Sequence, residues 1–208
     1  MLDTASLAQV AGRRIESHRM RVIAGKYRSR PLRSLPGMDV RPTSDRLRET
    51  LFNVLCAGNP DALAGTTWFD LYAGTGAVGI EAISRGATIA YFAEASKAAA
   101  DLIGANLKSL GISSGFQIER SEASKALGQW DSAGVRADYI FLDPPYRLRD
   151  EYAKTFNAVA DSKLVSASTT VIAEHEKRFD PGENFGLLQR YRRLDQGDAA
   201  LSFYRRIE

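Results

Sequence analysis

The sequence predicts an α/β protein built on a mostly parallel β-sheet. Short apolar runs alternate along the chain with stretches of helical spacing, a pattern typical of a parallel sheet covered by helices on both faces. A glycine-rich stretch follows one of the first apolar runs, at the place where such sheets bind ligands. The 208 residues are 44% hydrophobic and 25% charged, which is typical of one globular domain with an appendage.

Strands and helices alternate from residue 67 onward. The expected strands cover 67–72, 88–94, 116–119 and 138–142, and the expected helices between and after them cover 78–85, 96–110, 124–130 and 151–160. Apolar positions at helical spacing predict a further helix near 45–55, with Thr43 or Ser44 as its cap. Three last strands, at 169–173, 187–194 and 200–206, complete a seven-stranded sheet that ends in an antiparallel hairpin at its edge.

The N-terminal part is expected to be an appendage on a domain that covers 41–208. Residues 1–19 form an extension with helical tendency and no motif, whereas 20–40 alternate arginines with small or apolar residues before a Pro36-Gly37 turn. This predicts a small β-hairpin with arginines on one side. Eleven basic and only three acidic residues lie between Arg13 and Arg48, although the whole chain is only +3. A basic arm on an acidic body favours a nucleic-acid-binding appendage over a plain solvated face.

Composition argues against several classes of protein. No apolar run approaches the ~20 residues of a membrane span. The first ten residues lack the basic start of a signal peptide. One cysteine, Cys56, and two histidines, His18 and His175, exclude a disulfide framework and argue against a metal site. We therefore expect a cytoplasmic protein without a membrane or metal partner, and nothing in the sequence indicates more than a monomer.

The tetrapeptide Asp143-Pro144-Pro145-Tyr146 directly follows the apolar run at 139–142. Both prolines lack an N–H and fix φ, so the chain leaves the strand in a stiff, extended form. The Asp143 carboxylate, a free Pro144 carbonyl and the Tyr146 ring are then held in one arrangement. Two acceptors beside a stacking surface suit a planar group with an exocyclic NH2, such as a nucleobase. The simpler alternative is a proline-stiffened loop after a buried strand.

A glycine loop follows the first strand of the predicted sheet. Its sequence is Ala73-Gly74-Thr75-Gly76, and glycines there allow a sharp turn and a close approach to a ligand at the start of a helix. The next strand ends in Glu94, which is placed to accept two hydrogen bonds from ribose hydroxyls. The spacing also matches the dinucleotide fingerprint, so a nicotinamide oxidoreductase is a rival interpretation.

Asp70, just before the glycine loop, argues for a different ligand. A carboxylate there would repel a pyrophosphate but attract an ammonium group. S-adenosylmethionine has such an ammonium at one end and an adenosine at the other, and it fits better than NAD. The alternative for Asp70 is a carboxylate that caps the loop. Glu122, after the third strand, would accept from the adenine amino group, or else would be a surface acid that caps a helix. The expected cofactor residues are Asp70, Tyr72, Ala73, Gly74, Thr75, Gly76, Glu94, Glu122 and Asp143.

These motifs together resemble the class I methyltransferases. More narrowly, the chain from Met20 to Arg206 resembles the bacterial family that methylates a guanine N2 of 16S ribosomal RNA. The runs 21–28 (RVIAGKYR) and 41–53 (RPTSDRLRETLFN) are specific to that family. The glycine loop and the Asp143 to Tyr146 motif are shared by many amino-methyltransferases of DNA and RNA. Glu122 and the Ala95-Ser96 pair depart from the family pattern, which leaves the adenine contacts open.

The resemblance implies a Rossmann-like class I methyltransferase fold and S-adenosylmethionine as cofactor. It implies methyl transfer to a guanine N2 of 16S rRNA, of the guanine-966 type, in the 30S subunit or an assembly intermediate. The expected catalytic residues are Asp143, Pro144, Pro145 and Tyr146: Asp143 and the Pro144 carbonyl would hold the target amine, and Tyr146 would stack on the guanine. The residues expected to bind RNA are Arg21, Lys26, Arg28, Arg30, Arg33, Arg41, Thr43 and Arg46. The alternatives are an amino-methyltransferase of tRNA or DNA on the same scaffold, and a binding module that has lost catalysis.

Overall fold

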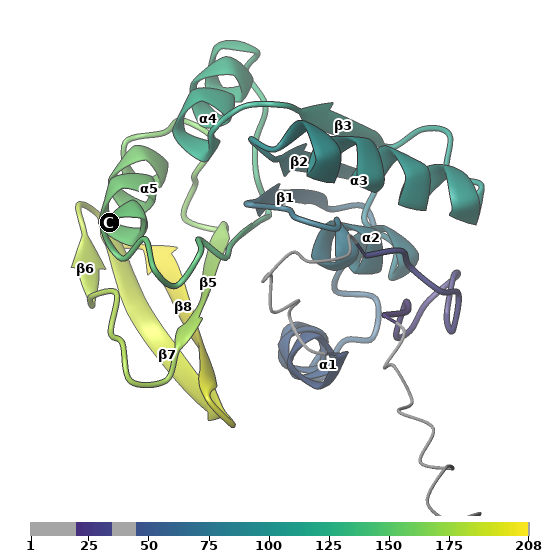
Figure 1. Cartoon of the computed structure of the whole chain (residues 1–208). Coiled ribbons are helices and arrows are strands. Elements are labelled where there is room, and N and C mark those ends of the chain that lie inside the picture. Colours follow the sequence, from purple (N-terminus) through teal and green to yellow (C-terminus); the bar gives the residue numbers. More distant parts are fainter. Residues whose placement is uncertain (1–19, 35–44, 208) are drawn as a thin grey trace, which may run out of the picture.

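The computed structural model describes residues 20–34 and 45–207, and Figure 1 shows their arrangement. The predictions for residues 1–19, for the Pro36-Gly37 turn, for Arg41 and Thr43, and for a helix cap at Ser44 lie outside the described residues.

An eight-stranded sheet forms the centre of the described part, in the order β3-β2-β1-β4-β5-β8-β7-β6. Strands β1 to β5 are parallel, and β8, β7 and β6 each pair antiparallel with their neighbours. The strands are β1 (Thr67–Leu71), β2 (Ile89–Ala93), β3 (Phe116–Glu119), β4 (Tyr139–Leu142), β5 (Thr170–Glu176), β6 (Asn184–Phe185), β7 (Leu188–Gln196) and β8 (Ala199–Arg206). The seven expected strands and the antiparallel hairpin are confirmed. The sequence analysis missed only β6, because a two-residue strand is too short to show a period.

Five helices among the described residues cover the two faces of this sheet (Figure 1). They are α1 (Asp45–Leu55), α2 (Ala77–Ser84), α3 (Lys97–Leu110), α4 (Ala123–Ser132) and α5 (Asp150–Ala160). Side chains of α1, α2 and α3 share a core with Phe92, Phe141 and Ile172, whereas those of α4 and α5 pack on the opposite strand face. This follows from the alternation of side chains along each strand. No described helix has the length and apolarity needed to cross a membrane.

The strand order creates a place where a ligand can bind. From β1 the chain moves outward through β2 to β3, and it then returns to the other side of β1 to form β4 and β5. Loops that leave β1 and β4 therefore turn to opposite faces of the sheet, and a crevice opens at the carboxyl ends of these two strands. The glycine loop follows β1 and the Asp143 to Tyr146 motif follows β4, so the fold brings both motifs to this point.

The predicted hairpin near the N-terminus is present only as a short, irregular one. Arg21 and Pro31 form a single antiparallel bridge, with the Val22 N–H donating to Arg30 at 3.0 Å and the Leu32 N–H donating to Met20 at 2.8 Å on either side of it. The turn that connects these segments packs closely on α2: Gly25 has φ of 77°, and a Cβ built on it would lie 1.9 Å from the Ser84 carbonyl oxygen. Only glycine tolerates both conditions. Met20, Val22 and Leu32 of this segment are buried in the core, and the rest of the predicted hairpin, residues 35–40, lies outside the described residues.

Candidate functional site

The pairing of the central strands fixes which residues meet at the crevice. In the parallel register, Leu142 of β4 lies between Leu71 of β1 and Ala173 of β5. The backbone N–H of Asp143 also donates to the Leu71 carbonyl at 3.4 Å. Asp143 and Glu174 therefore occupy equivalent positions, one residue beyond this aligned row, and their side chains emerge on the same face of the sheet.

The glycine loop is a tight turn at the start of α2. Gly74 and Gly76 have φ of 55° and 76°, the left-handed conformation that glycine adopts without steric cost. The Ala73 N–H donates to Ala93 of β2 at 3.0 Å, and the Gly76 N–H donates back to Ala73 at 2.7 Å. Buried Thr75 supplies a carbonyl that accepts from the Asn106 side chain of α3 at 3.0 Å. The loop is thus shaped before any ligand arrives.

Glu94 joins the glycine loop to the beginning of α3. One carboxylate oxygen accepts from the Gly74 N–H at 2.9 Å, and the other accepts from the Ser96 N–H at 2.8 Å. Each carboxylate oxygen has a second lone-pair position, so the side chain can still accept from the two hydroxyls of a ribose. This geometry fits the predicted role of Glu94, and it also gives the residue a structural one.

Asp70 lies beneath the loop and is almost entirely buried. Its carboxylate accepts from the Gly79 N–H at 2.8 Å. Burial raises the pKa of Asp70 from 3.8 to about 8; the Gly79 hydrogen bond opposes this shift, and the charge of Glu94 adds to it. The capping of Gly79 matches the simpler of the two interpretations of Asp70, whereas attraction of a ligand ammonium stays a prediction.

The Asp143 carboxylate differs from the other two acids. The residue is half-buried, and no described residue donates a hydrogen bond to its carboxylate. Burial raises its pKa well above the ordinary value, and the charges of Glu174 and Asp70 raise it further. A carboxylate with open acceptor positions is suited to bind an incoming N–H group, and a raised pKa makes its ionised form a stronger base.

The prolines of the motif hold this acid in place. The Pro144 carbonyl, which was expected to be free, lies 3.4 Å from the Tyr152 hydroxyl, whose single proton is donated to the Glu174 carbonyl at 2.8 Å. Tyr152 belongs to α5, so the contact was invisible in the local sequence, and one lone pair of the carbonyl stays open. The Pro145 carbonyl accepts from the Leu148 N–H at 2.7 Å, which closes the turn after the motif.

The sequence analysis missed Glu174, which lies beside the motif. Glu174 is in β5 and is only 4% exposed. One oxygen of its carboxylate lies 3.4 Å from the hydroxyl of half-buried Tyr146. A usable signal was present, because Glu174 is an acidic residue at the carboxyl end of an apolar strand, but its partner became evident only from the β4–β5 pairing.

Two predicted cofactor residues have side chains held by other elements. Tyr72 has φ of 65°, unusual for a non-glycine residue, and its hydroxyl lies 3.0 Å from Glu151 and 2.5 Å from Thr155 of α5. It therefore anchors the end of β1 to α5. Glu122 is exposed at the N-cap of α4 without a side-chain cap bond, and it lies 3.6 Å from Lys154. Contact of Glu122 with adenine stays a prediction, and helix capping by its side chain is not observed.

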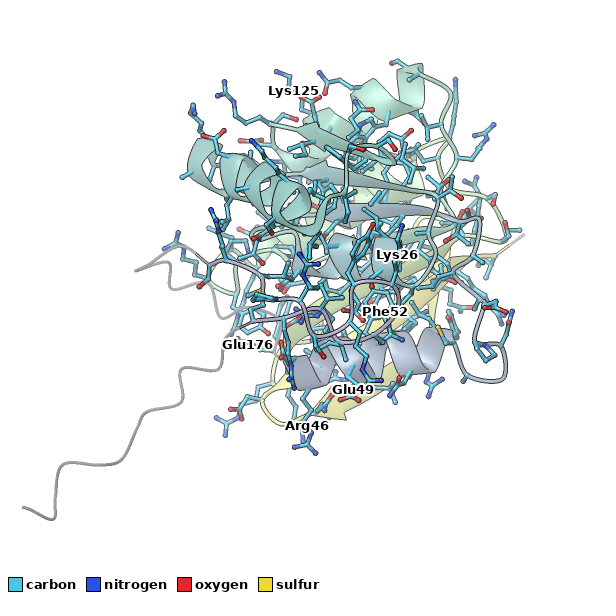
Figure 2. The ribbon with its side chains drawn as sticks, turned by 90° about the vertical axis from the view of Figure 1, so that its right-hand side faces the viewer. Lys26, Arg46, Glu49, Phe52, Lys125 and Glu176 are labelled. Carbon is cyan, nitrogen blue, oxygen red and sulfur yellow. The ribbon has the colours of Figure 1, made fainter. Side chains whose placement is uncertain are left out.

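The predicted RNA-binding residues differ in whether their side chains already contact other residues of the protein. Arg21 lies 3.6 Å from Asp45, and Arg30 donates to the Ser109 carbonyl at 3.0 Å. The remaining described members of the set are exposed: Lys26, Arg28, Arg33 and Arg46. Figure 2 shows Arg46 extending from α1 away from the body of the protein, with Lys26 on the same side of the molecule. Exposed cations of this kind are suited to bind phosphate groups.

A buried ion pair connects this basic segment to the helix that follows the glycine loop. Arg48 of α1 is completely buried, donates to the Arg21 carbonyl, and lies 3.9 Å from Glu81 of α2. Glu81 is also completely buried and accepts from the N–H groups of Ile23 at 2.7 Å and Ala24 at 2.9 Å. We call these contacts the Arg48–Glu81 network. They fix the position of segment 20–34 relative to the crevice.

Comparisons with known proteins give the same picture over nearly the whole chain. A family model described as "Conserved hypothetical protein 95" matches residues 20–205. The chain is 29% identical over 187 residues to a protein of Bacillus subtilis named "Putative rRNA methyltransferase YlbH", covering 90% of this chain and 99% of that protein. It is 35% identical over 162 residues to the "Ribosomal RNA small subunit methyltransferase D" of Escherichia coli, covering 77% and 76% of the two chains.

A solved structure shares the fold. The "Putative methyltransferase yhhF from Escherichia coli" superposes with a TM-score of 0.77 at 28% identity, covering 91% of this chain and 99% of that one. These similarities confirm the predicted class I methyltransferase fold, and they confirm S-adenosylmethionine as the cofactor. The glycine loop and the open lone pairs of Glu94 fit that molecule. The chain belongs to the ribosomal RNA small subunit methyltransferase D family.

Proposed function

We propose that this methyltransferase transfers a methyl group to the exocyclic N2 of a guanine in small-subunit ribosomal RNA. The observation that carries the proposal is the Asp143 carboxylate at the end of β4, which has open acceptor positions and lies near Asp70, the acid beneath the glycine loop. Two curated relatives are named as rRNA methyltransferases, which supports RNA of the small subunit as the substrate class. Within that class we propose guanine 966 of 16S rRNA, presented by the 30S subunit or an assembly intermediate.

The cofactor would be held by the loop that follows β1. S-adenosylmethionine supplies an electrophilic methyl group on a sulfonium centre. The residues from Ala73 to Gly76 would lie against its methionine part, and Glu94 would accept from its ribose hydroxyls. Asp70 would contribute negative charge beneath the loop while it continues to cap Gly79. Glu122 is the candidate for the adenine amino group.

The target amine would be held by the motif that follows β4. The lone pair of a guanine N2 is delocalised into the ring, which makes the amine a weak nucleophile. Acceptance of its N–H groups by the Asp143 carboxylate and the Pro144 carbonyl would localise that lone pair and direct it at the methyl. The N–C bond forms as the S–C bond breaks, and the surplus N2 proton passes to Asp143, whose raised pKa suits that task. The acceleration comes from positioning and fixed charges.

The RNA would be gripped outside this crevice. Extrusion of a base costs a few kcal/mol, and stacking on the Tyr146 ring would return about 1–3 kcal/mol of it. Exposed Lys26, Arg28, Arg33 and Arg46 would neutralise phosphates. Binding should therefore weaken steeply as the salt concentration rises.

The test is transfer of a tritiated methyl group from S-adenosylmethionine to 30S subunits that lack the modification, followed by nucleoside analysis. N2-methylguanosine in the RNA, absent with Asp143→Ala and retained with the exposed control Glu183→Ala, is the expected result. Label in tRNA or DNA, with none in 30S subunits, would keep the chemistry and replace the proposed substrate by the rival one. Label on another atom of the guanine would overturn the role given to Asp143.

A further inference from the structure

Two tyrosines converge on Glu174 from different parts of the chain. The Tyr146 hydroxyl, in the loop after β4, lies 3.4 Å from a carboxylate oxygen of Glu174. The Tyr152 hydroxyl, on α5, donates to the backbone carbonyl of Glu174 at 2.8 Å and lies 3.4 Å from the Pro144 carbonyl. One residue of β5 is therefore the common point to which the ring, the proline turn and α5 are attached.

The position of Glu174 in the sheet is as informative as its contacts. It is 4% exposed and directly follows the apolar run 171–173 of β5, and burial of a carboxylate costs several kcal/mol unless polar partners offset the loss of water. Its side chain emerges on the same face as that of Asp143, one strand away. A side chain that only filled the core at this position would be apolar.

The orientation of the Tyr146 ring needs such an anchor. The preceding prolines fix the backbone of the motif, but they do not set the two side-chain torsions of Tyr146. A ring that turns away from the plane of the target base no longer defines where the amine sits relative to Asp143. Misplacement of a reacting group by about 1 Å can lower a rate by about 100-fold. The hydroxyl contact of 3.4 Å is long, and contacts of this kind tighten when a substrate binds.

We propose that Glu174 is a positioning residue for the methyl transfer: its carboxylate holds the Tyr146 hydroxyl and so sets the ring against which the target base stacks. The proposal rests on the proposed function, because it assigns a role to Tyr146 in that reaction. Glu174 does not touch the methyl group or the amine and acts through Tyr146. Its effect should therefore fall on the rate of the bound complex and should spare cofactor affinity.

The test is a double-mutant cycle of Glu174→Leu and Tyr146→Phe, with kcat on 30S subunits and the Kd for S-adenosylmethionine as readouts. Glu174→Leu should lower kcat about 10- to 100-fold and leave the Kd unchanged. Tyr146→Phe should lower kcat by a similar factor, and Glu174→Leu should have no further effect in the Tyr146→Phe background. Glu174→Gln keeps an oxygen that accepts from the tyrosine and should restore most of kcat. Glu176→Leu, two residues further along β5, is the matched control.

Three outcomes would overturn the inference: effects of the two variants that multiply in the double variant, a Glu174→Gln variant as slow as Glu174→Leu, or a Tyr146→Phe variant with full kcat. The last outcome does not depend on whether Glu174→Leu folds, and an unfolding curve checks that variant for the other two. An unmodified protein that does not methylate 30S subunits would refute the proposed substrate instead. The same cycle would then be measured on the RNA or DNA that accepts the label.

Discussion

Glu81 and Asp143 are both carboxylates in the interior of the protein, and they have opposite surroundings. Glu81 is completely buried and receives two backbone N–H groups, the Arg85 guanidinium at 2.7 Å and the more distant charge of Arg48. Asp143 receives no hydrogen bond to its carboxylate from any described residue and faces two further acids, Glu174 and Asp70. One acid is saturated with partners from its own chain, and the other is left with open acceptor positions.

This difference separates a structural use of a buried acid from a chemical one. Hydrogen bonds from the donors around Glu81 offset the free-energy cost of removing its carboxylate from water. The carboxylate can therefore join α2 to segment 20–34. Without such donors the native state disfavours the ionised form of Asp143, and this raises its pKa. We therefore expect substitutions at the two positions to have opposite effects on stability and on activity.

The largest effect is expected at Glu81. Glu81→Gln removes the negative charge beside buried Arg48 and replaces an acceptor by an NH2 group that faces other donors. The free energy of unfolding should fall by about 3 kcal/mol, as when one partner of a buried pair is removed. A urea unfolding curve measures it. Lys97→Gln, which breaks an exposed pair with Asp101 on α3, should change stability by less than about 0.5 kcal/mol. Equal effects of both variants would contradict a structural role for the Arg48–Glu81 network.

Asp143→Asn should show the reverse pattern. The amide keeps one acceptor oxygen but cannot take up the N2 proton, so single-turnover methyl transfer should slow by about 100-fold. The free energy of unfolding at pH 7 should stay the same or rise, because a poorly solvated charge has been removed. Quenched-flow transfer of labelled methyl and a urea curve measure the two quantities. A large loss of stability would show that Asp143 is structural, like Glu81.

Asp70 should make stability depend on pH in an unusual direction. Its pKa is raised in the native state from 3.8 to about 8, so between these values the native protein holds a proton that the unfolded chain has released. The contribution of Asp70 to the free energy of unfolding should therefore fall as the pH rises from 4 to 8, by at most about 1.4 kcal/mol per pH unit. Asp70→Asn, whose amide oxygen still accepts from Gly79, should reduce that slope.

Unfolding curves at several pH values compare the two proteins. Asp180, whose pKa is lowered to about 2 by Arg190, stabilises the native state in its ionised form. That stabilisation is lost only as the pH falls below 4, outside the pH range that tests Asp70. An unchanged slope between pH 4 and 8 in Asp70→Asn would mean that Asp70 is ionised in the native state at neutral pH.

The smallest effect is expected on the basic side. Lys26→Ala should weaken RNA binding several-fold and should lower the slope of log affinity against log salt by about one. Lys125→Ala removes the same charge from an exposed position on α4, and Figure 2 shows Lys125 well apart from Lys26. This variant should change neither the affinity for RNA nor the salt slope. Filter binding at several salt concentrations gives both slopes. Equal losses for both lysines would indicate that net charge alone attracts the RNA.

Local chemistry made much of the site predictable. The glycine loop, Glu94 and the Asp143 to Tyr146 motif each follow a strand directly, so their meeting at one edge of a parallel sheet follows from the alternation of elements. Glu174 and Tyr152 escaped prediction, because their roles depend on contacts with residues outside their own segments. Arg48 shows the same limit: by charge it belongs to the basic arm, but it is buried in the core.

The sequence by itself determined the fold class and the motifs of the site, since hydrophobic periodicity, glycine and proline act over a few residues. The tertiary structure decided how each buried polar group is partnered. It placed the short N-terminal hairpin on α2, where the N–H groups of Ile23 and Ala24 donate to the Glu81 carboxylate. It also placed Glu174 beside Asp143. Partners of this kind are far apart in the chain and meet only when strands and helices pack, so no local pattern records them.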